Sequence, residues 1–370
     1  MFDHGVRVRV FLFAGICALF AWGCPDDACD SPDGAYCPVP GAYTVAAPKR
    51  LVLYDPDRDH NLSIKIYHPE EAGPFPVILF SHGAGDSKEG APLLTRFWCS
   101  HGYVCIHPSH FTEEEGTIPS YSLARFKLEF ELLDLLGPLA WYDRVRDLTY
   151  IVDSFGELVE LEPALAGKMD TARIGVGGHS LGGYTALLVG GVRVRDPLLG
   201  DFIEYSDGRV GPILVMSGPG NDDNELVEES WAPLTGPMMV MGGSRDPGFF
   251  GVAMGIPSSW RMEPFEYAPG TDKYSVFFEG ARHLSYLGPM SIDEDAYWFD
   301  QWPGSPRDQA AAVLRPESAA LAQGAIFGDV AVASLAFWDA YLKDAPDAIA
   351  FLRSGQLEAR SAGTVSIEWK

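Results

Sequence analysis

One segment, from Arg173 to Thr185, constrains the fold of this chain more than any other. It reads Arg-Ile-Gly-Val-Gly-Gly-His-Ser-Leu-Gly-Gly-Tyr-Thr. Apolar residues alternate with small ones in its first half, as in a buried strand, and Leu181 to Val189 is typical of a helix. Between them, Gly178-His179-Ser180-Leu181-Gly182 is a G-x-S-x-G pattern in a strand–turn–helix setting. We expect a sharp, strained turn that places the Ser180 hydroxyl above a helix N-terminus, with glycines where side chains would collide with neighbouring elements.

Apolar strands alternate with helical segments along the rest of the chain. From residue 76 onwards this alternation predicts an α/β fold, with a mostly parallel, doubly wound sheet of about eight strands and helices on both faces. We place one domain over residues 46–345, after a tether at 24–45 and before a C-terminal extension at 346–370. Besides the segment above, the predicted strands are Leu51 to Tyr54, Leu62 to Tyr67, Pro76 to Ser81, Tyr103 to His107, Ile213 to Met216, Pro237 to Gly242 and Tyr274 to Glu279.

Residues 1–23 have the layout of a signal peptide. Two arginines precede an apolar run from Val10 to Trp22, which is too short for a comfortable membrane span, and Gly23 follows. The Gly23-Cys24 junction resembles the processing box of bacterial lipoproteins, in which the cysteine is lipidated. We predict export to the bacterial cell envelope and membrane association through a lipid on Cys24; the alternative is an unanchored periplasmic or secreted protein.

Four cysteines remain beyond the signal peptide and Cys24, in two local pairs. An oxidising destination predicts the disulfides Cys29–Cys37 and Cys99–Cys105, with free buried thiols as the alternative. Neither pair has the CxxC spacing of a zinc or redox site. The histidines of His107-Pro108-Ser109-His110 have no carboxylate or cysteine at ligand spacing, so we expect no metal. The net charge of −24 argues against nucleic acid as a partner.

Three glycine-containing turns follow predicted strands and carry the residue types of an acyl-transfer site. They are His82-Gly83-Ala84-Gly85, Gly243-Ser244-Arg245-Asp246-Pro247 and Gly280-Ala281-Arg282-His283. In an open parallel sheet the site lies at the carboxyl ends of the strands, so we expect these turns to meet there.

The turns supply the parts of a serine hydrolase in the chain order that this fold imposes. We predict Ser180 as the nucleophile, His283 as the base and Asp246 as the acid that orients His283. The backbone amides of Ala84 and Leu181 are the predicted oxyanion donors.

A second position for the acid stays open. Asp222 and Asp223 follow the strand from Ile213 to Met216, and some hydrolases of this fold place the acid there. These two residues lie in the polar stretch Gly-Asn-Asp-Asp-Asn-Glu at 220–225, which is typical of a solvated loop. We prefer Asp246, because an acid that orients a histidine works best partly buried.

With these motifs the chain resembles the alpha/beta-hydrolase superfamily over roughly residues 46–345. Within it, the chain is similar to the dienelactone-hydrolase-like group that includes platelet-activating-factor acetylhydrolases. The resemblance implies a serine carboxylic-ester hydrolase without a cofactor. Export to the envelope fits an enzyme that acts on an acylated lipid or another small ester. Dienelactone hydrolases use a cysteine nucleophile where this chain has Ser180, so dienelactone itself is not the implied substrate. The matching signatures are Pro76 to Gly83, Gly178 to Gly183, Gly243 to Pro247 and Ala281 to His283, with Tyr54 to Pro56 and Ile66 to Pro69 upstream.

Two other functions remain as alternatives. One is amide or peptide cleavage by the same triad, and the other is an envelope binding lipoprotein that has lost catalysis. Aromatic residues near the predicted triad are candidates for an acyl pocket, or else ordinary core residues. They are Phe249, Phe250, Trp260 and the stretch from Tyr297 to Trp302, with Met254 beside them.

Overall fold

The computed structural model describes residues 36–110, 138–196, 199–221, 225–247, 257–288 and 316–370. The signal peptide, Cys24 and Cys29 lie outside these ranges. Export, the lipid anchor and the Cys29–Cys37 disulfide therefore stay predictions. Asp222, Asp223 and the aromatic stretches at 249–254 and 297–302 also lie outside the described residues.

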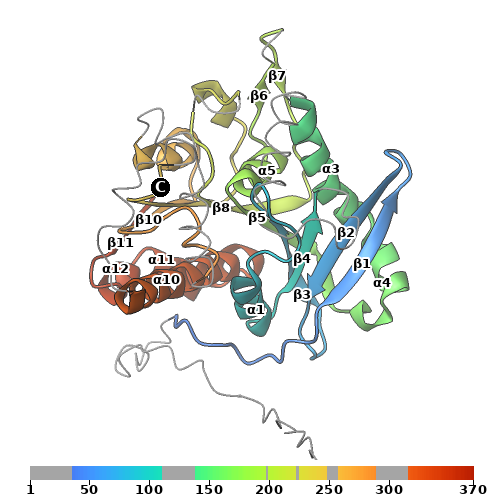
Figure 1. Ribbon diagram of the computed structural model, residues 1–370, viewed down its shortest axis with the longest axis horizontal. Coiled ribbons are helices and arrows are strands. Elements are labelled where there is room, and N and C mark those ends of the chain that lie inside the picture. The colour runs from blue at the N-terminus through green and yellow to red at the C-terminus, as the bar shows by residue number, and fades with distance from the viewer. Residues whose placement is uncertain (1–35, 111–137, 197–198, 222–224, 248–256, 289–315) are drawn as a thin grey trace, which may run out of the picture. The chain divides into compact units, whose positions relative to one another are not determined.

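A mixed sheet of nine strands forms the frame of the described region, in the order β1-β2-β4-β3-β5-β8-β9-β10-β11 (Figure 1). Neighbours from β4 to β10 pair in parallel, whereas the β1–β2, β2–β4 and β10–β11 pairs are antiparallel. The mostly parallel α/β arrangement expected from the sequence is therefore confirmed. The strands are β1 (Lys49–Asp55), β2 (His60–Tyr67), β3 (Phe75–Ser81), β4 (Val104–Ser109), β5 (Met169–His179), β8 (Val210–Met216), β9 (Met238–Gly243), β10 (Lys273–Phe278) and β11 (Val365–Trp369).

The expected count of about eight strands is wrong by one. The additional strand is β11, which pairs with β10 at one edge of the sheet. It comes from the residues that the sequence analysis treated as an extension. Only Val365 and Ile367 of its five residues are buried, so its apolar pattern is too short to mark a strand by itself.

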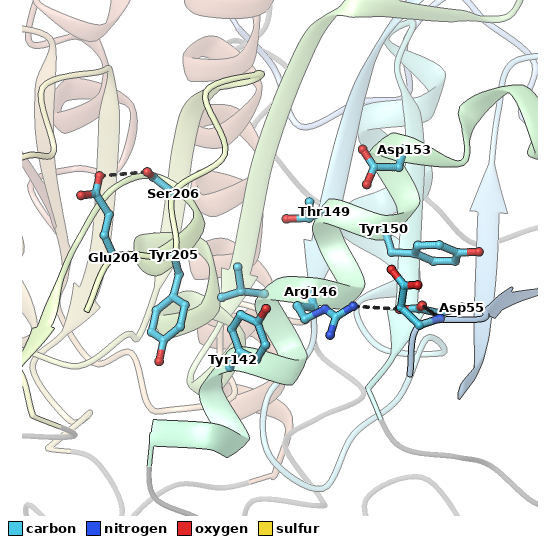
Figure 2. Close-up of a pocket in the computed structure, with 11 residues that line it drawn as sticks. Asp55, Tyr142, Arg146, Thr149, Tyr150, Asp153, Glu204, Tyr205 and Ser206 are labelled. Carbon is cyan, nitrogen blue, oxygen red and sulfur yellow. Dashed lines mark hydrogen bonds and ion pairs between the residues drawn. The ribbon is translucent and has the colours of Figure 1, made fainter. Parts of the chain in front are cut away.

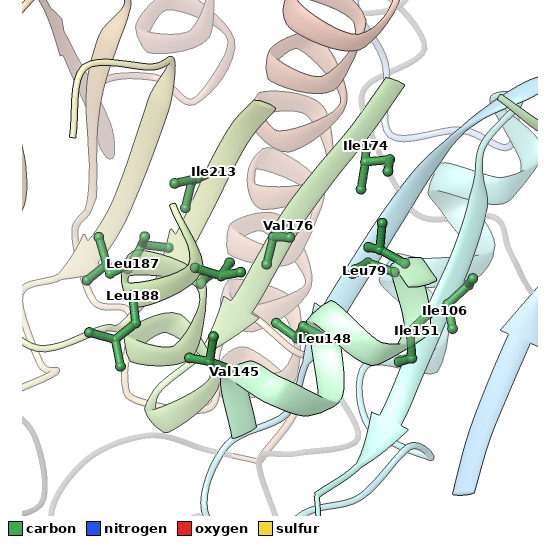
Figure 3. Close-up of a cluster of buried hydrophobic side chains, with 14 of the residues drawn as sticks. Leu79, Ile106, Val145, Leu148, Ile151, Ile174, Val176, Leu187, Leu188 and Ile213 are labelled. Atoms are coloured by element: carbon green, nitrogen blue, oxygen red, sulfur yellow. The ribbon is translucent and has the colours of Figure 1, made fainter. Parts of the chain in front are cut away.

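Helices cover both faces of the sheet. On one face, α3 (Pro138–Asp153) and α5 (Leu181–Val189) pack their apolar side chains against the central strands, as Figure 3 shows for Leu148 and Leu187. On the other face lie α1 (Pro92–Ser100) and α10 (Pro316–Leu342). The remaining described elements are α4 (Phe155–Leu161), α7 (Glu263–Tyr267), α11 (Pro346–Leu352), α12 (Gln356–Arg360), three short 3-10 turns and the ribbon β6 (Val194–Arg195) with β7 (Phe202–Ile203).

The alternating sequence of β5 matches this two-sided covering. Ile174 and Val176 belong to the core cluster with the α3 and α5 side chains. Gly175 faces α10, because a Cβ atom built on it would lie 2.7 Å from the Trp338 ring. Small residues on one side of β5 therefore allow the large Trp338 ring to pack directly on the backbone.

Helix α10 is long and apolar enough to cross a membrane, by length and composition alone. Its window Gly324–Leu342 has a mean hydropathy of 1.4, and 83% of that window is buried inside the domain. The apolar surface of α10 thus belongs to the core of this domain.

The Cys99–Cys105 disulfide predicted from the spacing is wrong, because both residues are free thiols. Cys99 lies in α1 and Cys105 in β4, and both are completely buried. Burial raises the pKa of the Cys99 thiol to about 12 and that of Cys105 well above its ordinary value. These thiols serve as small apolar core groups.

Candidate active site

Ser180 occupies the strained turn that its sequence motif predicts. Its backbone lies at φ 54° and ψ −120°, between β5 and α5. A Cβ on Gly178 would lie 2.1 Å from the carbonyl oxygen of Gly182, and a Cβ on Gly182 would lie 1.9 Å from that of Ser81. Glycine is therefore required at both positions, and the close packing presses the turn against the end of β3.

Ser180, His283 and Asp246 form one chain of hydrogen bonds. The Ser180 Oγ atom lies 3.0 Å from His283 Nε2, and His283 Nδ1 lies 3.1 Å from Asp246 Oδ1. The Asp246 side chain is fully buried, whereas that of His283 is 24% exposed. The acid is thus shielded from water while the imidazole stays accessible at the carboxyl edge of the sheet.

Backbone contacts between two neighbouring turns bring Asp246 to His283. β9 and β10 are parallel neighbours, so the turns that follow them lie side by side. The amide of Ser244 donates to the carbonyl of Phe278 at 3.1 Å, and that of Arg245 donates to the carbonyl of Ala281 at 3.0 Å. These two bonds fix the register of the acid against the imidazole.

Three polar side chains that the sequence analysis did not single out surround the Asp246 carboxylate. Ser217 Oγ lies 2.7 Å from His283 Nδ1, the Tyr286 hydroxyl donates to Asp246 Oδ2 at 3.2 Å, and Arg261 Nε lies 3.0 Å from Asp246 Oδ1. Burial alone would raise the pKa of Asp246, but the charge of Arg261 and the hydrogen bonds from His283 and Ser217 lower it below the ordinary value. Asp246 is therefore ionised at neutral pH.

The sequence carried only weak signals for these three residues. Ser217 directly follows β8, at the same sheet edge as the other turns. Tyr286 lies three positions after His283, and Arg261 is a lone basic residue between Trp260 and Met262.

His179, which directly precedes Ser180, also contacts His283. Its Nε2 atom lies 2.6 Å from the carbonyl oxygen of His283, to which it donates. Burial, and next the nearby charge of His283, lower the pKa of His179 to about 3. His179 is therefore neutral at neutral pH and positions the backbone of His283.

The predicted oxyanion donors lie on the two segments that meet at Ser180. Gly83 is so close that a Cβ built on it would lie 3.4 Å from Ser180 Cβ. In the described residues, the turns and loops contain no backbone hydrogen bond that the amide of Ala84 or of Leu181 donates. Leu181 opens α5, so its amide also belongs to the positive end of that helix.

The histidines of the β4 segment take part in core hydrogen bonds. His107 Nε2 lies 3.0 Å from Thr95 Oγ1, and His110 contacts Ser81 and Asp147. No group of three or more potential metal-ligating side chains was found among the described residues.

A cavity of about 320 Å³ lies elsewhere, between α3 and the segment that follows β7 (Figure 2). Tyr142, Arg146 and Tyr205 line it, and none of Ser180, His283 and Asp246 does. Its walls include the carboxylates of Asp55 and Asp153, which are paired with Arg58 and Arg209.

Of the aromatic candidates for an acyl pocket, only Trp260 lies in the described residues. It is 8% exposed, its indole nitrogen donates to the carbonyl of Pro247 at 3.3 Å, and its ring lies under the Arg261 guanidinium. Trp260 is therefore largely buried, and it contacts the backbone of Pro247, which directly follows Asp246.

Comparison with known proteins gives a limited similarity. No family model matches the chain. A chlorophyllase type 0 from Chenopodium album is 26% identical over 148 residues, which are 39% of this chain. The match spans 33% of that protein's length. This similarity and the mostly parallel sheet fit the alpha/beta-hydrolase superfamily; neither bears on the dienelactone-hydrolase-like group.

Proposed function

We propose that this chain is a serine hydrolase that cleaves carboxylic esters through an acyl-enzyme on Ser180. The observation that carries the proposal is the hydrogen-bond chain from Ser180 Oγ through His283 to the buried Asp246. The distant similarity to a chlorophyllase supports an ester hydrolase at the general level.

In the proposed reaction, Ser180 Oγ attacks the ester carbonyl while His283 Nε2 accepts the hydroxyl proton. Asp246 accepts a hydrogen bond from Nδ1–H, which selects the tautomer with a free Nε2 and stabilises the imidazolium that forms. His283 then returns the proton to the leaving alcohol as the tetrahedral intermediate collapses to the acyl-enzyme. Water, activated by the same imidazole, attacks the acyl-enzyme and releases the acid and free Ser180.

The negative charge that develops on the carbonyl oxygen needs fixed donors. We assign this role to the amides of Ala84 and Leu181, because the segment around Gly83 packs against Ser180 and Leu181 begins α5. Every step uses side chains and amides of the chain itself, so the mechanism needs no cofactor.

The proposed substrate class is an acylated lipid or another small ester. A panel of p-nitrophenyl esters of graded acyl length, set beside matched anilides, tests both the reaction and the length preference. The proposal expects ester turnover that Ser180→Ala abolishes, and labelling of Ser180 by a fluorophosphonate probe. Faster cleavage of the anilides would indicate an amidase, and absence of both labelling and turnover would indicate a non-catalytic binding protein.

We also propose that the mature protein is exported and carries a lipid on Cys24, on the basis of the apolar run and the Gly23-Cys24 junction. Mass spectrometry of protein isolated from its native envelope tests this. An unmodified N-terminus at another residue would reduce the proposal to secretion.

A further inference from the structure

A buried arginine lies directly behind the proposed triad. Arg261 is 4% exposed and belongs to a short 3-10 turn, Ser258–Met262, that precedes α7. We propose that Arg261 is a positioning residue for ester hydrolysis, which keeps Asp246 ionised and directs it at His283. This inference rests on the proposed function, because its effect on turnover requires the Ser180–His283–Asp246 chain.

The guanidinium joins two strand-end turns. Its Nη1 donates to the carbonyls of Ser217 at 2.6 Å and Gly218 at 2.8 Å, in the turn after β8. Its Nε donates to the carbonyl of Asp246 at 2.9 Å, in the turn after β9, and also lies 3.0 Å from Oδ1 of that residue. One rigid, planar group thus fixes the backbone of the acid and of Ser217 at once.

Arg261 also sets the charge balance of the site. Four described side chains face the Asp246 carboxylate. Ser217 and Tyr286 are uncharged donors, His283 is the histidine of the triad, and Arg261 is a permanent cation. The nearby His179 is neutral because burial lowers its pKa to about 3. Arg261 is therefore the group that compensates a fully buried carboxylate while His283 is neutral.

The position of the guanidinium restricts what the imidazole can do. Arg261 Nη2 lies 3.3 Å from His283 Nδ1. An arginine has only donors, so it cannot accept a hydrogen bond from Nδ1–H. The acceptors left for that proton are Asp246 Oδ1 at 3.1 Å and Ser217 Oγ at 2.7 Å. Arg261 fixes the backbone that carries each of them, and so directs Nε2 towards Ser180.

The test compares three single variants. Arg261→Met removes both charge and donors, Arg261→Lys keeps the charge without the planar fork, and Tyr286→Phe removes an uncharged donor from the same carboxylate. We expect Arg261→Met to lower kcat/KM by at least about 100-fold, in line with the loss of an orienting group. The acid limb of its plot of kcat/KM against pH should move to higher pH, because Asp246 then protonates more readily. That limb reports the Asp246–His283 pair as a unit.

Arg261→Lys should keep the acid limb of the kcat/KM profile at the wild-type pH while losing part of kcat. Tyr286→Phe should move that limb less than Arg261→Met does, because it removes a hydrogen bond but no charge. If Arg261→Met loses stability but keeps the wild-type limb, the residue is a packing element only and the inference is wrong. A limb that moves equally in Arg261→Lys and Arg261→Met would also overturn it, since charge would then not be the cause.

A second measurement does not depend on activity. In the Asp246→Asn background there is no carboxylate to compensate, so Arg261→Met should lower the urea midpoint less than it does in the wild-type background. Equal losses in both backgrounds would contradict the coupling of the two charges. If wild-type protein hydrolyses no ester, the proposed function fails, whereas this double-mutant cycle still reports whether Arg261 compensates Asp246.

Discussion

Ser81 Oγ lies 2.8 Å from Nε2 of His110, which is the same pair of atoms that joins Ser180 to His283. His110 Nδ1 in turn lies 2.8 Å from Asp147 Oδ2. The described region thus contains a second serine–histidine–aspartate chain, but the side chains of His110 and Asp147 are at most 1% exposed. The two chains also differ in the acid, because burial raises the pKa of Asp147 to about 6 whereas the charge of Arg261 and two hydrogen bonds lower that of Asp246.

This resemblance supplies a matched control for the proposed nucleophile. Ser180→Ala should lower ester turnover by at least about 1000-fold and abolish fluorophosphonate labelling, because the nucleophile and its partners act as a unit. Ser81→Ala should keep the labelling and lower the free energy of unfolding by about 1–3 kcal/mol, since it leaves His110 Nε2 buried without its partner. Active-site titration and urea unfolding of both variants check this; labelling that persisted in Ser180→Ala would point to another nucleophile.

Replacement of the acid should act on activity and stability together. Asp246→Asn should cost on the order of 10⁴-fold in kcat, because an amide favours the wrong histidine tautomer. The same change leaves the Arg261 cation buried without its carboxylate, and breaking such a pair typically costs about 3–5 kcal/mol. Steady-state kinetics and urea unfolding measure the two effects. Asp222→Asn is the comparison variant, and a larger loss of kcat there would reassign the acid.

The contact between Gly182 and Ser81 predicts a severe effect from a single methyl group. A Cβ on Gly182 would lie 1.9 Å from the Ser81 carbonyl oxygen, so Gly182→Ala must separate α5 from the end of β3. We expect a loss of at least about 3 kcal/mol in unfolding free energy, at or beyond the upper end of ordinary overpacking. Gly156→Ala is the control, since nothing lies within 4 Å of a Cβ there. It should leave stability unchanged or raise it by up to about 1 kcal/mol.

Buried neutral histidines predict a loss of stability in mild acid. Burial lowers the pKa of His107 and His179 to about 3, and that of His110 well below its ordinary 6.5. The unfolded chain binds protons at these histidines below pH 6.5, so their contribution to stability is full above that pH and is lost as the pH falls. Each histidine contributes at most about 1.4 kcal/mol per pH unit to the slope of the unfolding free energy against pH.

Asp147 acts in the opposite direction. Burial raises its pKa to about 6, so below that pH the folded state binds a proton that the unfolded state does not. This stabilises the folded state as the pH falls and offsets the loss of unfolding free energy from about one histidine. Urea unfolding at pH 7, 6 and 5 should therefore give falling stability, and His107→Gln should reduce the slope. A slope of zero or of the opposite sign between pH 6.5 and 5 would contradict the prediction.

Local patterns were sufficient to predict which side chains meet at the carboxyl ends of the central strands. The alternation in β5, the glycines around Ser180 and the apolar runs before Asp246 and His283 each express a rule that acts within a few residues. Parallel pairing then brings those strand ends to one edge, and the three side chains are in contact there.

The parts that sequence reasoning missed depend on packing between distant segments. Nothing local distinguishes Arg261 from a surface arginine; it becomes a buried partner of Asp246 only because its turn packs beside β9. The prediction of the Cys99–Cys105 disulfide was wrong although these residues are close in sequence, because spacing alone does not determine how two side chains are oriented. Cys99 and Cys105 are only six positions apart, but one belongs to a helix and the other to a strand, and both remain free thiols.

The pairing of β11 with β10 also has a consequence for synthesis on the ribosome. β10 leads into the turn with His283, and its outer edge is covered by residues 365–369, which are translated much later. Until they emerge, the nascent chain presents the backbone N–H and C=O groups of β10 unpaired, a state open to pairing with another chain. Interception by chaperones, or aggregation, should therefore concentrate in the interval between the translation of β10 and that of β11.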